Sequence, residues 1–331
     1  MLGRASWGAQ MNKPTTSLSA IVRTLAAVLW LLLIYTIFTA LTIKRNKPSL
    51  AEGINGGWLL AVVSTQSIAV LIALAFRGNL FSTRVFTGDW SKARTLTFLL
   101  AMVAVWFGTS NAAREIVKEA AMYARERRIN LQIAPYIASK FVVLIGISVV
   151  QNLVLLFPLL VTGAGILRLP LLYVALMAGS VAGIGMGLMI SALAPNPDRA
   201  SILVPLVLIP QIIFGGPLIG AGSNIIVATI SHFMVTKWTW KALGATVNTD
   251  KIPTQPVELQ GFRPEQIAQL AAQNTNPNIV NTGGRLYYQA PVGNDFGAVG
   301  YTFVYLLVLA LFIVVSLTLV AYFLRRKDRV R

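Results

Sequence analysis

Long charge-free runs are the feature that most restricts how this chain can fold. Seven windows contain no Asp, Glu, Lys or Arg and are rich in Leu, Val, Ile and Ala. About 20 apolar residues in an α-helix cross the hydrocarbon core of a bilayer, where the backbone must satisfy its own hydrogen bonds. The windows therefore predict an all-α integral membrane protein; they are Thr24–Ile43, Gly53–Phe76, Thr95–Ala113, Phe141–Leu167, Leu169–Pro197, Ala200–Thr236 and Phe296–Leu324.

The composition excludes several classes of site. Only 12% of the residues are charged, about half the share in a soluble domain. The chain has no cysteine and a single histidine, His232, which excludes disulfides, thiol nucleophiles and histidine-rich metal sites. We expect no catalytic, cofactor-binding or metal-binding residues. The net charge of +17 fits Lys and Arg retained on cytoplasmic loops better than nucleic-acid binding.

The sixth window is too long for one span. Ala200–Thr236 includes Pro205, Pro210 and several glycines, which interrupt helices. We predict a span to about Leu218, followed by a short re-entrant or interfacial element over Ile225–Met234. The next segment, 237–295, is rich in Asn, Gln, Thr and Pro. It is predicted to be a water-facing insert before the last helix, partly helical at 264–273.

Two basic clusters set the orientation. One lies at 114–140 and the other at 325–331, and the positive-inside rule places both in the cytoplasm. Four predicted spans separate them, if the short element after Leu218 does not cross. Because four is even, both clusters fall on the same side and the insert at 237–295 is external. We expect a multi-pass protein of the cell (inner) membrane.

The first basic cluster also contains acids. Residues 111–140 hold three of the eleven acidic residues and six basic ones. On a helix Glu115 and Glu119 share one face and Arg114 and Lys118 another, and like charges four residues apart are mildly unfavourable. A partner protein is one way to satisfy these charges. A solvated loop helix without a partner is the alternative.

The amino-acid sequence of this cluster resembles that of a known family. The segments 106–119 (WFGTSNAAREIVKE), 123–131 (YARERRINL) and 136–140 (YIASK) are similar to the membrane domain of type-2 ABC transporters of the G-subfamily kind. The resemblance covers about residues 66–331. It implies six transmembrane helices, here with one extra N-terminal helix, and a cytoplasmic coupling helix at 112–135.

That resemblance implies a permease subunit rather than an enzyme. Its substrate would be hydrophobic or amphipathic, and ATP with Mg²⁺ would be bound by a separate nucleotide-binding domain, because we find no Gly-x-x-x-x-Gly-Lys-Ser/Thr loop. A homodimer in the lipid membrane, with no nucleic acid, is expected. The residues implied to contact the ATPase are Arg114, Glu115, Lys118, Glu119, Tyr123, Arg125 and Glu126.

The N-terminal part has a different resemblance. Residues 20–75 look like two helices of the tellurite-resistance and dicarboxylate (SLAC-type) anion channels, which predicts a separate segment at 1–65. An anion channel or carrier fragment, a non-functional fusion, and chance likeness between apolar strings are the alternatives.

Polar and small residues inside the predicted spans mark further candidates. Asn152 and Gln211, with Phe214 nearby, are candidates for a translocation path, because polar groups in a membrane often face a cavity or another helix. Gly179, Gly183 and Gly187 are spaced for close helix approach. They predict either packing within the subunit or a contact between subunits.

Overall fold

The structure is a computed structural model, and parts of the chain lie outside its description. The described residues are 68–72, 75–76, 81, 89–161, 168–216, 224–252, 257–258, 279–282, 285–288 and 296–330. The predicted span Thr24–Ile43, most of Gly53–Phe76 and the helix expected at 264–273 fall outside these residues.

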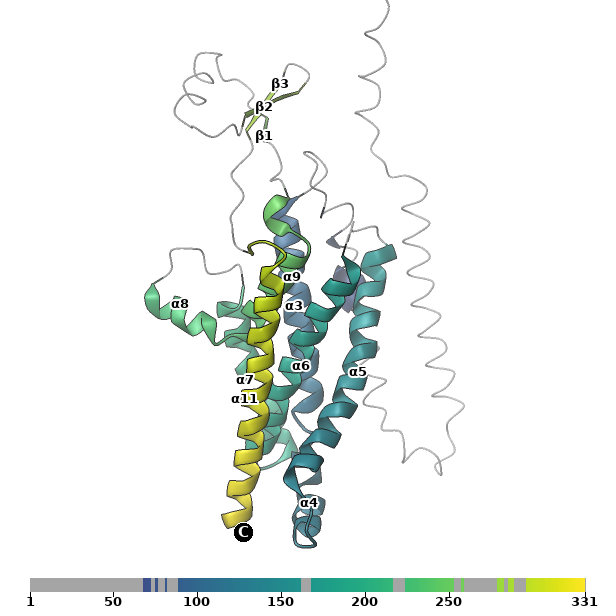
Figure 1. Ribbon diagram of the computed structural model, residues 1–331, viewed down its shortest axis with the longest axis vertical. Helices are drawn as coiled ribbons and strands as arrows, with labels where there is room; N and C mark the ends of the chain where they lie inside the picture. Colours follow the sequence, from purple (N-terminus) through teal and green to yellow (C-terminus); the bar gives the residue numbers. More distant parts are fainter. Residues whose placement is uncertain are drawn as a thin grey trace, which may run out of the picture.

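In the described part of the chain, five long helices form an elongated bundle (Figure 1). All five contain a stretch long and apolar enough to cross a bilayer. The predicted multi-pass helical membrane fold is therefore confirmed, whereas the total of six helices plus one stays a prediction. The five are α3 (Trp90–Ala112), α5 (Ile133–Val161), α6 (Leu169–Leu193), α7 (Pro197–Phe214) and α11 (Tyr301–Val330).

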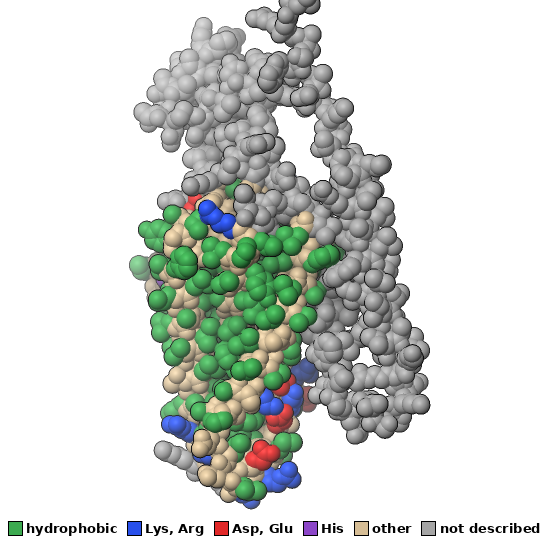
Figure 2. Space-filling view, turned by 45° about the vertical axis from the view of Figure 1, so that its right-hand side comes forward, with side chains coloured by type: hydrophobic (Ala, Val, Ile, Leu, Met, Phe, Trp, Pro, Cys, Tyr) green, Lys and Arg blue, Asp and Glu red, His purple; other side chains and the backbone are tan. Residues whose placement is uncertain are grey.

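The interior of the bundle is built around α3 and α6. These two helices are mostly buried, whereas α5, α7 and α11 expose most of their apolar surface. Val142 on α5 and Leu307 on α11 are among the exposed residues. In Figure 2, apolar side chains cover most of the length of the visible surface of the bundle, and charged side chains gather toward its lower end. An apolar belt of this extent on a soluble protein would be a liability, but in a bilayer it is the lipid-facing surface.

Glycines allow α3 and α6 to touch through their backbones. A Cβ atom added to Gly183 would lie 2.5 Å from the carbonyl oxygen of Val105, and one added to Gly187 would lie 2.4 Å from that of Thr109. The Thr109 hydroxyl also donates to the Gly183 carbonyl at 3.2 Å. Two glycines of the predicted motif therefore pack α6 against α3 within the subunit, as small residues do between membrane helices, whereas Gly179 faces Thr239.

The long sixth window is divided into shorter helices. Helix α7 ends at Phe214, slightly before the predicted Leu218, and α8 (Ile225–His232) occupies the place of the predicted short element. Helix α8 projects sideways from the bundle (Figure 1). Its first two residues, Ile225 and Ile226, are exposed.

The start of the predicted insert differs from expectation. Helix α9 (Val235–Thr246) packs against α3, α6 and α11 instead of lying in water. Trp240 and Leu243 are buried, and the indole N–H of Trp240 donates to the Arg94 carbonyl at 3.2 Å. Lys237 and Lys241 made this stretch look like a soluble loop, but α9 buries its other face.

The described remainder of the insert adds a small sheet that an all-helical prediction did not include. After η2 (Thr249–Lys251), the strands β1 (Val257–Glu258), β2 (Ile279–Thr282) and β3 (Arg285–Tyr288) pair antiparallel in the order β1-β3-β2. Strands this short carry too few residues for an alternating pattern to be detected.

Both charged clusters lie at one end of the bundle. Helix α4 (Ala120–Arg127) is next to the C-terminal end of α11 (Figure 1), and Arg127 forms an ion pair with Asp328 across 2.8 Å. We call this the α4 end. The structure thus agrees with the even number of spans between the clusters.

Candidate functional site

Residues 113–132 connect α3 to α5 and are only partly helical. We call them the linking segment. It contains η1 (Val117–Glu119) and α4, and it turns again at Asn130, whose φ is 81°. Asn tolerates this left-handed conformation better than most residues. The coupling helix predicted at 112–135 stays a prediction; within these bounds the structure has η1, α4 and the first residues of α5, which begins at Ile133.

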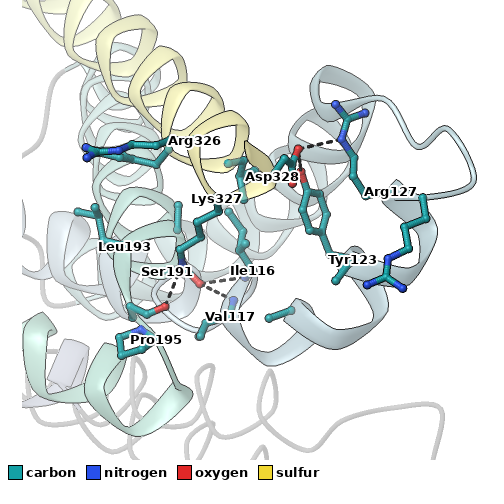
Figure 3. Close-up of a pocket in the computed structure, with 17 residues that line it drawn as sticks. Ile116, Val117, Tyr123, Arg127, Ser191, Leu193, Pro195, Arg326, Lys327 and Asp328 are labelled. Carbon is teal, nitrogen blue, oxygen red and sulfur yellow. Dashed lines mark hydrogen bonds and ion pairs between the residues drawn. The ribbon is translucent and has the colours of Figure 1, made fainter. Parts of the chain in front are cut away.

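Three side chains from three different helices hold the linking segment, and we call them the anchor residues. Ser191 on α6 accepts backbone N–H bonds from Ile116 and Val117 at 2.9 and 3.0 Å (Figure 3). These donors lie where a helix start leaves N–H groups without partners. These two hydrogen bonds therefore join the linking segment to α6.

The other two anchor residues act through charge. Lys140 on α5 contacts the Glu119 carboxylate at 2.6 Å. Asp328 on α11 accepts from Arg127 Nε at 2.8 Å and from the Tyr123 hydroxyl at 3.3 Å (Figure 3). With Ser191, these contacts attach the segment to α5, α6 and α11.

Tyr123 faces the interior. Its side chain is buried, and its ring lies 5.0 Å from the Tyr136 ring, centroid to centroid. Burial, together with the negative charge of Asp328, raises the pKa of Tyr123 to about 12, so the phenol stays a neutral donor. Its side chain packs within the subunit, and contact of Tyr123 with a partner stays a prediction.

The acids of the segment also have internal partners. Glu115 pairs with Lys118, and Glu119 pairs with Lys140. These two carboxylates therefore have partners within the chain, and their contact with an ATPase stays a prediction. The η1 turn changes the register from the assumed helix, so the two acids no longer share one unpaired face.

The outward side of the linking segment carries a mixed surface, which we call the outward face. Four residues predicted to contact an ATPase lie on it, namely Arg114, Lys118, Arg125 and Glu126. Two exposed apolar side chains accompany them: Met122 is 50% exposed and Ile129 is 79% exposed. Apolar side chains among charged ones are typical of protein contact surfaces. Ile129 was not predicted as part of this surface; it follows the charged run 125–128 in the sequence.

The candidates for a translocation path lie inside the subunit. The Asn152 amide donates to Ser180 Oγ at 2.9 Å, and Ser180 Oγ donates to the Ala104 carbonyl at 3.1 Å, which joins α5, α6 and α3. Gln211 accepts from the Thr236 backbone N–H at 3.0 Å. Phe214, the last residue of α7, is partly buried. A role for these three residues in a path stays a prediction.

Replacement of Asp328 should loosen the linking segment. The ion pair is partly exposed, so Asp328→Ala should cost only about 1 kcal/mol locally, equivalent to roughly fivefold faster amide exchange in α4. Hydrogen exchange with mass spectrometry measures this directly. Asp198→Ala, at an exposed position in α7, is the matched control. Equal exchange of α4 in both variants would show that Asp328 does not hold it.

Comparison with known proteins agrees with this architecture. The family model for the ABC-2 type transporter matches residues 9–246. The chain therefore belongs to the ABC-2 type transporter family, and it is a membrane-embedded transport permease. Because the match includes most of the N-terminal segment, the resemblance of residues 20–75 to anion channels is unsupported. The boundary predicted at residue 66 stays a prediction.

One relative combines two functions in its name. Over 167 residues the chain is 28% identical to the ABC transporter ATP-binding/permease protein Rv1747 of Mycobacterium tuberculosis. The match covers 48% of this chain and 19% of that protein. The chain thus matches about a fifth of the length of this relative.

Proposed function

We propose that this chain is the permease subunit of an ABC transporter and that the linking segment is the coupling element for a separate ATPase. The observation that carries the proposal is the outward face, which leaves cationic and apolar side chains exposed while the anchor residues fix its other side. The ATP-binding/permease name of the relative supports an ATP-binding partner. The partner binds ATP and Mg²⁺, and this chain binds neither.

The anchor residues suggest how motion reaches the membrane helices. A force on the linking segment passes through Ser191 to α6, through Lys140 to α5 and through Asp328 to α11. Helix α6 in turn touches α3 through backbone contacts at Gly183 and Gly187. The partner thus acts by favouring one of two bundle arrangements, since a ligand shifts an equilibrium only through differential contacts.

We further propose a homodimer in the inner membrane, with the α4 end in the cytoplasm. Positive charge supports this orientation, because basic residues concentrate at the α4 end. The substrate class, hydrophobic or amphipathic molecules, rests on family analogy alone.

Reconstitution tests the proposal. The full chain is placed in lipid vesicles with the ATP-binding part of the Mycobacterium relative, and ATP hydrolysis is compared with that of the same ATPase in empty vesicles. We expect hydrolysis to rise several-fold when the chain is present. Equal rates with and without the chain, at an ATPase concentration that saturates binding, would contradict a coupled permease.

A further inference from the structure

A cavity of about 830 Å³ opens at the α4 end between the linking segment, the end of α6 and the last turns of α11 (Figure 3). Four basic side chains and one acidic side chain line it. The acid, Asp328, is already occupied by Arg127 and Tyr123. The cavity therefore has an excess of positive charge, which favours an anionic ligand.

The remaining walls are largely apolar, and their position coincides with the ends of two spanning helices. Leu193 closes α6 and lines the cavity, as do Phe323 and Leu324 on α11. The charge-free stretch of α11 ends at Leu324, and three basic residues follow at 325–327. The cavity thus lies where both helices leave the hydrocarbon region, with its apolar wall toward the membrane and its cations beyond.

Two of the four cationic side chains have neither a hydrogen bond nor an ion pair among the described residues. Arg127 binds Asp328, and the Lys327 ammonium donates to the Ala194 carbonyl at 3.2 Å. Arg128 and Arg326, in contrast, are exposed and line the cavity from α4's end and from α11. Guanidinium groups match phosphate oxygens in charge and in fork geometry.

We propose that this cavity binds the headgroup of an anionic phospholipid from the surrounding leaflet. The excess positive charge of the lining, to which Arg128 and Arg326 contribute from opposite sides, attracts its phosphate, and Leu193 and Phe323 contact the glycerol region and the start of the acyl chains. A soluble phosphate gains nothing from contact with the apolar wall, whereas a lipid contacts it with its glycerol region and acyl chains. Basic pockets between membrane helices are known to bind acidic lipid headgroups. The bound lipid adds a link between the linking segment and α11 beside that of Asp328. This inference does not depend on an ATPase partner.

Native mass spectrometry of the purified full chain tests the site. The protein is incubated with phosphatidylglycerol or with phosphatidylcholine of the same acyl chains, and the fraction that keeps one lipid is measured. We expect phosphatidylglycerol to be retained preferentially by the wild type. Removal of each arginine should weaken retention about fivefold, so Arg128→Gln with Arg326→Gln should weaken it about 25-fold if the effects add.

Arg199→Gln is the matched control, because Arg199 is exposed at the start of α7 and does not line the cavity. It should retain lipid like the wild type. Retention by the double variant equal to that of Arg199→Gln would overturn the proposal. Displacement of phosphatidylglycerol by inorganic phosphate or by an acidic peptide at equal concentration would overturn it as well, because a soluble anion would then be the occupant. Gel filtration of each variant confirms that it remains folded.

Discussion

Gly183→Leu should prevent the chain from folding, and Gly183→Ala should already destabilise it by about 1–3 kcal/mol. The Cβ atom of either variant would lie 2.5 Å from the Val105 carbonyl oxygen and 3.2 Å from the Thr109 nitrogen. These are backbone atoms of α3, which cannot move aside like the tip of a flexible side chain. The helices must separate, which also weakens the bond between Thr109 and the Gly183 carbonyl.

Gly146 provides the control for this change. It lies on α5, and a Cβ atom there would meet nothing within 4 Å. Gly146→Ala should therefore be neutral or slightly stabilising, since alanine favours helix more than glycine. The thermal midpoint of the detergent-solubilised protein and the monodisperse yield measure both effects. If the Gly183 and Gly146 variants unfold at the same temperature, the close contact of α3 and α6 is not what holds the bundle together.

Charge reversal on the outward face should release the ATPase. Arg114 and Arg125 are exposed and have no ion pair among the described residues, so their replacement leaves the anchor contacts intact. Loss of a close charge contact in an interface costs about 2–5 kcal/mol. Arg114→Glu with Arg125→Glu should therefore weaken ATPase binding at least about 100-fold, measured by co-purification and by titration.

Two further variants distinguish a specific contact from a general charge effect. Arg199→Glu changes the same charge at an exposed site outside the linking segment and should leave binding unchanged. Tyr123→Phe removes only the hydroxyl that donates to Asp328, so it should also retain the ATPase. Equal loss with Arg199→Glu would mean that net charge, rather than the outward face, governs association.

The sequence predicted the long helices well because their signal is local. Windows without charge mark α3, α5, α6 and α11 directly, since hydrocarbon excludes charged side chains. Helix α9 was missed because it is amphipathic, with Lys237 and Lys241 on one face and Trp240 buried on the other. The helix starts at Ile133, several residues before the predicted Phe141, because Lys140 interrupts the charge-free window that was used to place the span.

The candidate site was predicted only in part. The sequence identified the charged cluster. It did not predict which of its side chains are exposed, because that depends on the η1 turn between α3 and α4, which the spacing of the residues does not indicate. Asp328 and Tyr123 are 205 positions apart in the sequence, and Ser191 looked like an ordinary small residue near the end of a span. Contacts of this range arise from the bundle as a whole. The contact of Tyr123 with an ATPase stays a prediction that the family resemblance implies, and its bond to Asp328 was not predicted.

Site-directed cross-linking at Met122 tests the central claim most directly. The chain has no cysteine, so Met122→Cys carries the single thiol to which a photoreactive group can be attached. In vesicles with the ATPase, we predict a cross-linked product from position 122 and none from Val142→Cys, which is exposed on the apolar surface of α5. No product from position 122, under conditions where the ATPase co-purifies, would contradict the assignment of the linking segment as the coupling element.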